Sequence, residues 1–179
     1  MPHIIIDHNL HNIKTPEFIL RLEKAWNLRL LTSDCCDEIE SFIELFNDFF
    51  QLCEGEKGSC SEILTACPPS KNINKDKFVL GLYDDFTLIG LVDIIRDYPV
   101  KKTWTIGYFL IHPKYRGQGT GSKFIKDLEK ALSPAKLRCI VQKQNVRALN
   151  FWKSNGFLIK SQKKDMVGKL NSVIYVLEK

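Results

Sequence analysis

Hydrophobic residues in the first third of the chain recur mostly at helical spacing. A short helix is expected after Thr15, which suits an N-cap and is followed by proline and glutamate. Residues 28–32 alternate and are rich in leucine, which predicts a strand. A longer helix is expected from Ser33 or Asp34 to Gly55, because apolar residues three and four apart form one buried face. That face consists of Ile39, Phe42, Ile43, Phe46, Phe49 and Phe50.

The middle of the chain changes from helical to strand-like patterning. Residues 61–66 are predicted to form a short helix, and residues 70–75 a polar loop. The apolar runs 78–83 and 86–96 are separated by two aspartates, which predicts two strands joined by a turn. The run 104–111 predicts a further strand, which a proline ends.

The last third predicts a strand–helix–strand unit followed by another helix and two strands. Residues 137–141 form a short apolar strand that comes after a helix and an earlier strand, so a parallel pair is expected. A second helix is expected to begin near Asn145 and to end near Gly156, which suits a left-handed cap. Residues 157–161 and 173–177 then complete a mixed sheet with helices on its faces.

Three alternating glycines, Gly117, Gly119 and Gly121, separate the strand 104–111 from the next helix. Backbone N–H groups at the start of a helix bind anions, so we expect a phosphate-bearing cofactor here. The spacing does not fit a P-loop, because the sixth position from Gly117 is Ser122. It does not fit the dinucleotide fingerprint Gly-x-Gly-x-x-Gly either. A purely structural turn is less favoured, since three glycines cost entropy without packing against anything.

Two motifs resemble those of the Gcn5-related N-acetyltransferase (GNAT) superfamily. The segment from Arg116 to Gly121 matches the pattern Arg/Gln-x-x-Gly-x-Gly/Ala of its acetyl-CoA loop. The segment from Asn145 to Phe157 is similar to its pattern Asn-x-x-Ala-x-x-Phe-Tyr-x-x-x-Gly-Phe. The resemblance implies the GNAT fold: a mixed, mostly antiparallel twisted sheet with a central parallel strand pair and helices on both faces. We expect a GNAT domain over residues 26–179, after an N-terminal extension of residues 1–25.

The resemblance also implies acetyl-CoA as the cosubstrate and assigns its contacts. Backbone N–H groups of the glycine loop would bind the pyrophosphate, and the pantetheine arm would pair with the main chain of the preceding strand. The basic side chains Lys114, Arg116, Lys123 and Lys153 are candidates for the adenosine phosphates. The implied cofactor-binding residues are Phe109, Leu110, Ile111, Arg116, Gly117, Gln118, Gly119, Thr120, Gly121, Ser122, Asn145, Ala148, Phe151 and Trp152.

The implied reaction is direct transfer of an acetyl group to a primary amine of a small molecule or protein. Two positions depart from the family: Trp152 replaces the tyrosine that often protonates the thiolate, and Thr105 stands where many members carry a glutamate base. A non-catalytic acyl-CoA-binding or regulatory module is therefore the alternative. Substrate specificity is expected in residues 53–77 and 163–171. The fallback catalytic candidates are Asp93, Asp97, Tyr108 and Tyr175.

Composition limits the remaining functions. The net charge of +5 suits an anionic ligand, but no dense basic run indicates a nucleic-acid partner. No apolar run approaches the roughly 18 residues of a membrane span, so we expect a cytoplasmic protein with no membrane partner. The sequence does not distinguish a monomer from a homodimer.

Cysteine and histidine usage indicates no metal site. The six cysteines include no Cys-x-x-Cys pair, and scattered, reduced thiols are expected. We interpret His3, His8 and His11 as part of an N-terminal segment without a metal function.

Overall fold

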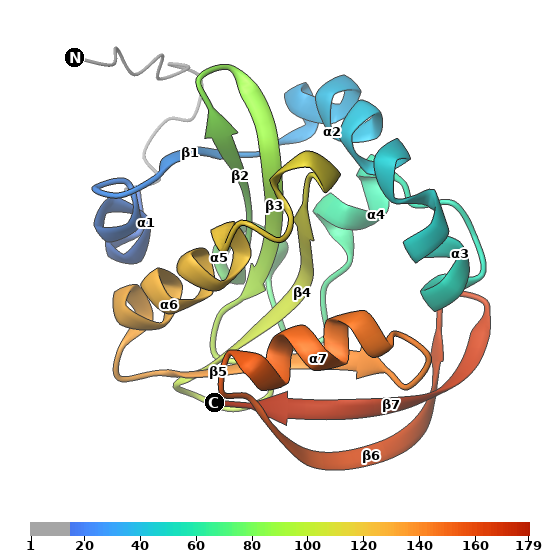
Figure 1. The fold of residues 1–179 in the computed structure, drawn as a ribbon. Helices are drawn as coiled ribbons and strands as arrows, with labels where there is room; N and C mark the ends of the chain where they lie inside the picture. The colour runs from blue at the N-terminus through green and yellow to red at the C-terminus, as the bar shows by residue number, and fades with distance from the viewer. Residues whose placement is uncertain (1–14) are drawn as a thin grey trace.

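The computed structural model describes residues 15–179 and contains one seven-stranded sheet in the order β1-β2-β3-β4-β5-β7-β6 (Figure 1). Neighbouring strands are antiparallel except β4 and β5, which are parallel. The predicted mixed sheet with one central parallel pair is therefore confirmed. The strands are β1 (Asn27–Leu30), β2 (Lys77–Asp84), β3 (Thr87–Ile95), β4 (Thr103–Ile111), β5 (Lys136–Gln142), β6 (Leu158–Val167) and β7 (Leu170–Glu178).

Seven α-helices accompany the sheet within residues 15–179. They are α1 (Glu17–Leu22), α2 (Cys36–Ile43), α3 (Asn47–Glu54), α4 (Cys60–Thr65), α5 (Ile73–Asp76), α6 (Thr120–Leu132) and α7 (Val146–Ser154). Three single 3₁₀ turns are η1 (Ser33–Cys35), η2 (Glu44–Phe46) and η3 (Pro113–Tyr115).

Two predictions about the helices need correction. The single helix predicted from residue 33 to Gly55 is instead divided into η1, α2, η2 and α3. Cys35, with φ −95° and ψ 10°, and Phe46, with φ −121° and ψ 18°, leave helical geometry directly before α2 and α3. The predicted end is right, since Gly55 caps α3 in the left-handed conformation with φ 73°. The loop predicted over residues 70–75 contains part of α5, where the Asn72 side chain accepts a hydrogen bond from the Asn74 N–H at 2.9 Å.

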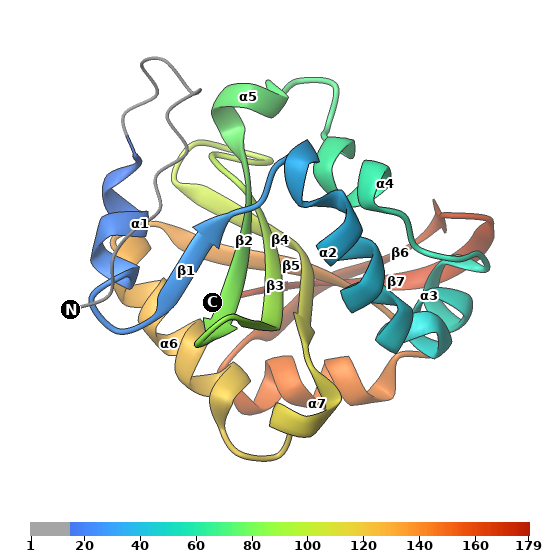
Figure 2. The same ribbon diagram turned by 90° about the horizontal axis from the view of Figure 1, so that it is seen from above.

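Hydrophobic cores lie on both faces of the sheet. Helices α1, α6 and α7 cover one face, while α2, η2 and α4 cover the other (Figures 1 and 2). Helix α1 lies within the segment that was predicted to be an extension. Its Phe18, Ile19 and Leu22 are buried in the first core, and the Phe18 ring centroid lies 4.9 Å from that of Trp104.

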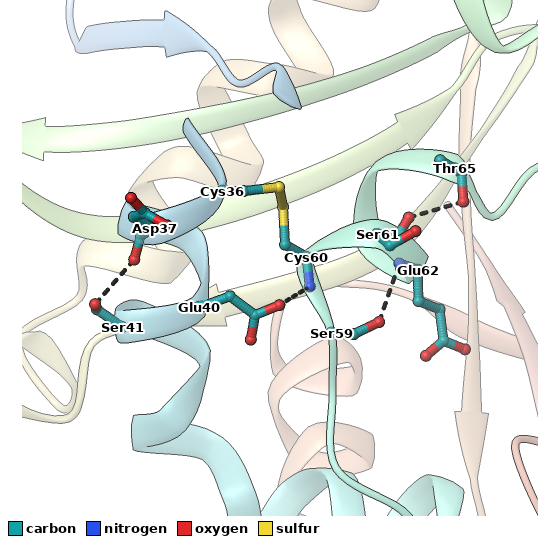
Figure 3. Close-up of a disulfide and its surroundings, with 9 residues drawn as sticks. All are labelled: Cys36, Asp37, Glu40, Ser41, Ser59, Cys60, Ser61, Glu62 and Thr65. Atoms are coloured by element: carbon teal, nitrogen blue, oxygen red, sulfur yellow. Dashed lines mark hydrogen bonds between the residues drawn. A yellow bond between two sulfur atoms is a disulfide. The ribbon is translucent and has the colours of Figure 1, made fainter. Parts of the chain in front are cut away.

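A disulfide between Cys36 and Cys60 joins α2 to α4, with their Cα atoms 5.5 Å apart (Figure 3). The prediction that all cysteines are reduced is wrong for these two. They are separated by 24 residues in sequence, and only the packing of two helices against each other brings them together. Close by, the Cys60 N–H donates to Glu40 Oε1 at 2.6 Å (Figure 3).

Candidate functional site

The parallel pairing of β4 with β5 stops before β4 ends. Its register runs from Thr103, opposite Lys136, to Ile106, opposite Cys139. Strand β4 then continues to Ile111 paired only with β3. Within residues 15–179, the backbone edge of β4 that faces β5 is therefore unpaired beyond Ile106. An extended ligand can add to such an edge as a strand would.

A bulge in β4 lies where this unpaired edge begins. Val92 of β3 pairs with Phe109 and Ile94 pairs with Ile106, so two residues of β4 stand opposite Asp93 alone. A bulge inserts one extra residue and re-aims the side chains beside it. Tyr108 and Asp93 are thereby placed together at the point where β4 leaves β5.

The glycine loop follows directly after β4 and η3. Gly117 and Gly119 adopt left-handed conformations with φ 74° and 81°, and a Cβ at either position would have no neighbour within 4 Å. The backbone conformation, and not packing, requires glycine here. Gly119 is the N-cap of α6 and supplies no side-chain cap, so the first N–H groups of this 13-residue helix have no capping side chain. These groups and the helix dipole suit a phosphate.

Two side chains from the loop hold its shape. Arg116 Nε donates to the Ile111 carbonyl at 2.7 Å, and its guanidinium lies 5.0 Å from the centroid of the Phe46 ring. Burial, followed by the nearby Arg147, lowers the pKa of Arg116. Gln118 Nε2 donates to the Lys114 carbonyl at 2.7 Å. Both residues were predicted as cofactor contacts, and in this structure their side chains brace the loop against its own backbone.

Aromatic residues of β4 and α7 pack against the glycine loop at the start of α6. A Cβ at Gly121 would lie 3.3 Å from the Phe151 ring and 3.5 Å from the Phe109 ring, so this glycine allows close packing. The Phe109 and Phe151 centroids are 5.8 Å apart. Trp152 is buried and its ring packs against Phe157 at 4.8 Å. The indole of Trp152 therefore belongs to the core beneath the loop.

Asn145 sits at the turn between β5 and α7. Its Oδ1 accepts a hydrogen bond from the Ala148 N–H at 3.0 Å and caps α7. Its Nδ2 donates to Cys53 Sγ at 3.5 Å. Burial raises the pKa of the Cys53 thiol to about 11, so the sulfur is a neutral acceptor at pH 7. The asparagine predicted to meet pantetheine is thus also tied to the last turn of α3.

The structure separates the four catalytic candidates. Asp97 adopts φ 53° in the turn before β4 and accepts from the Lys102 N–H at 2.6 Å, so it lies at the far end of β4 from the glycine loop. Tyr175 lies on β7, opposite Val141 of β5. Only Asp93 and Tyr108 share one location.

Asp93 is engaged by a buried lysine. The Asp93 Oδ1 and Lys77 Nζ atoms are 2.7 Å apart, with 4% and 1% of the side chains exposed. Burial raises the pKa of Asp93 to about 6, and the ammonium of Lys77 opposes that rise. Asp93 is therefore held in an internal ion pair.

Glu54, which was not among the candidates predicted from the sequence, is buried with 4% exposure. Its Oε1 accepts from the Tyr108 hydroxyl at 2.8 Å, while Oε2 is buried and has no hydrogen-bond partner among residues 15–179. Burial is the main cause that raises the pKa of Glu54, and burial together with the Glu54 charge raises that of Tyr108. A sequence signal existed, because residues 46, 50 and 54 are four apart on the buried face of the helix.

The described residues show neither a metal site nor a membrane helix. Within residues 15–179, no three His, Cys, Asp or Glu side chains are grouped to hold a metal ion. The N-terminal histidines lie outside the described residues. No helix in this part of the chain combines the length and apolar character needed to cross a membrane.

Comparison with solved structures identifies the same fold in several acetyltransferases. A probable acetyltransferase from Staphylococcus epidermidis superposes with a TM-score of 0.63 at 16% identity, covering 86% of this chain and 97% of the other. An N-acetyltransferase of Thermoplasma acidophilum in complex with coenzyme A gives 0.62 at 18% identity, covering 87% and 98%. A putative streptothricin acetyltransferase from Bacillus anthracis, in complex with acetyl coenzyme A, gives 0.50 at 18% identity, covering 58% and 63%.

Sequence comparison leads to the family. No curated protein matches the chain. Residues 39–157, however, match the family described as the acetyltransferase (GNAT) family. This segment extends from α2 to the end of α7 and contains both the glycine loop and Asn145. The chain therefore belongs to the GNAT family of acetyltransferases.

Proposed function

We propose that this protein is an enzyme that transfers an acetyl group from acetyl-CoA to a primary amine. The observation that carries the proposal is the adjacency of two features: an uncapped helix start with two left-handed glycines, and a β4 edge without a β5 partner. The first suits the pyrophosphate, and the second suits the extended pantetheine arm.

Named residues of this chain take defined parts in the proposal. The N–H groups from Gly117 to Ser122 bind the phosphates, and the main chain of residues 109–111 aligns the thioester. Phe109 and Phe151 form an apolar support beside Gly121. Acetyl-CoA supplies the activated acetyl group, and holding the amine beside it lowers the entropic part of the barrier.

The competing proposal is a non-catalytic acyl-CoA-binding module. Two observations favour it. Trp152 is buried against aromatic rings, and an indole N–H is not a practical acid. The Thr105 hydroxyl donates a hydrogen bond to the Tyr98 carbonyl at 2.7 Å, and a neutral hydroxyl cannot replace the glutamate base that many family members carry at this position. An enzyme must therefore use another group for proton transfer.

Thiol release from acetyl-CoA across a panel of amines separates the two proposals. The panel contains a polyamine, an aminoglycoside, a peptide with a free N-terminus and a peptide with an internal lysine. Amine-dependent thiol release supports the enzyme. Calorimetric binding of acetyl-CoA without release for any amine supports the binding module, and absence of binding contradicts both.

A further inference from the structure

Glu54 lies where four structural elements meet. It is the last residue of α3, and its side chain reaches Tyr108 on β4. Its own carbonyl accepts from the Lys169 N–H at 2.7 Å, in the turn between β6 and β7. Figure 1 shows α3 beside this hairpin, and a Cβ on Gly168 would collide with the Glu54 backbone. The position of Glu54 is therefore fixed from two sides.

The turn between β5 and α7 fixes Glu54 from a third side. Gln142 Nε2 donates to the Cys53 carbonyl at 3.4 Å, and Gln144 Nε2 donates to the Leu52 carbonyl at 3.2 Å. With the contact from Asn145 to Cys53 Sγ, three side chains of one turn hold the last turn of α3. The end of α3 thus joins the unpaired part of β4 to the residue predicted to hold pantetheine.

The second carboxylate oxygen of Glu54 lacks a partner. Oε2 is buried without a hydrogen bond among residues 15–179, and burying an unpaired polar atom is unfavourable. The negative charges of Glu62 and Glu56 further disfavour the ionised form of Glu54. The Lys169 ammonium forms an ion pair with Glu56, with Nζ 2.9 Å from Oε2. A cation brought by a ligand relieves this accumulation of negative charge.

We infer that Glu54 is the catalytic base of the proposed acetyl transfer and receives the proton of the acceptor ammonium, with Tyr108 as its positioning residue. The inference rests on the proposed function. In the step, R–NH₃⁺ gives one proton to the Glu54 carboxylate. The nitrogen then bonds to the acetyl carbon as the carbon–sulfur bond breaks, and the second nitrogen proton passes through water to the CoA thiolate. Glu54 finally returns its proton to solvent.

The surroundings of Glu54 match this role better than those of Asp93. Asp93 is neutralised by Lys77 at 2.7 Å, with both side chains buried. Among residues 15–179, the neutral Tyr108 hydroxyl is the only hydrogen-bond partner of the Glu54 carboxylate. The charges of Glu62 and Glu56 add to the rise in the pKa of Glu54, and those of Glu62 and Asp93 add to the rise in the pKa of Tyr108. The site therefore favours an incoming cation and a base whose pKa lies above its ordinary value.

A pair of CoA thioethers tests the inference without knowledge of the acceptor. S-(2-aminoethyl)-CoA places an ammonium close to the thioester position, and S-ethyl-CoA is its uncharged counterpart. We expect the wild-type protein to bind the aminoethyl compound about 10-fold more tightly at pH 8. This preference should disappear as the pH falls through the raised pKa of Glu54. Wild-type binding alone thus tests the proposal even where a variant does not fold.

Glu54→Gln should remove the preference and leave affinity for CoA unchanged. Glu44→Gln is the matched control, because Glu44 is an exposed carboxylate paired with Lys57 at 3.4 Å. The control should keep the preference. Equal binding of the two thioethers to the wild type, or a preference that survives in Glu54→Gln, would overturn the inference. Failure of the wild type to bind CoA would instead overturn the proposed function.

Discussion

The glycine loop and the last turn of α3 differ in how they are built. The loop offers backbone N–H groups beside two glycines whose Cβ positions face open space. The end of α3 offers a buried carboxylate that accepts from Tyr108, and its backbone carbonyls accept from side chains of the β5–α7 turn and from the β6–β7 turn. Recognition of a phosphate by main chain constrains the sequence strongly. Proton transfer by one buried side chain constrains only a single position.

The largest expected effect is a loss of stability when the buried Trp152, which packs in the core next to the glycine loop, is truncated. Trp152→Ala should lower the free energy of unfolding by about 3–5 kcal/mol, because a buried indole packed against Phe157 and Phe109 is lost. Denaturant unfolding measures this change. Trp152→Phe is the matched control and should lose roughly 1 kcal/mol. Equal stability of Trp152→Ala and the wild type would show that the loop does not depend on this core.

The next effect concerns α2 and α4, which cover the sheet face opposite α6 and α7. Replacing Cys36 and Cys60 with serine should lower the free energy of unfolding by about 3 kcal/mol, because the disulfide closes a loop of 24 residues. Acetyl-CoA affinity should not change. Unfolding in denaturant and calorimetry check the two parts. A large loss of acetyl-CoA affinity in a folded variant would show that the glycine loop depends on the disulfide-linked helices.

Gly119→Asp should weaken acetyl-CoA binding about 100-fold and leave the fold intact. A carboxylate at the N-cap repels the phosphates, and aspartate adopts positive φ more readily than most non-glycine residues, so the φ of 81° costs strain without preventing folding. Ser161→Asp on the exposed face of β6 is the control with the same added charge. Calorimetry should show wild-type affinity for this control. Unchanged affinity in Gly119→Asp would mean that the phosphates bind elsewhere.

The smallest effect is a difference between the stability losses at two pH values, which is separate from the overall cost of breaking a buried ion pair. Lys77→Met removes the ammonium that lowers the pKa of Asp93, so this pKa should rise above about 6. A carboxyl whose folded-state pKa is raised contributes stability at low pH and loses it as the pH rises through that value. The variant should therefore be more destabilised at pH 8 than at pH 5. Asp93 titration by NMR and unfolding at both pH values provide the check; a lowered pKa contradicts the expectation.

Sequence patterns predicted the architecture around the loop for identifiable reasons. The parallel pair β4 and β5 follows from the strand–helix–strand order. The turn between β4 and α6 was predicted from its three alternating glycines, and Gly117 and Gly119 of that turn adopt the left-handed conformation that glycine permits. In these cases local geometry and residue type are directly connected.

The contacts around the disulfide, Asp93 and Glu54 were not predictable in the same way. The Cys36–Cys60 disulfide depends on how α2 packs against α4, which no local pattern shows. Asp93 was an isolated acid in a strand, and only the sheet register places it beside Lys77. Glu54 was detectable only as an acid on an apolar helical face. Its importance becomes visible when β4, α7 and the β6–β7 turn are placed around it.

The most direct test of the account is to map acetyl-CoA on the wild-type protein by ¹H–¹⁵N NMR. The largest amide shifts are expected at Gly117, Gly119 and Gly121, with a second group at residues 109–111. These are the uncapped helix start and the unpaired edge of β4. Shifts confined to other parts of the protein, or no shifts at saturating acetyl-CoA, would contradict the account.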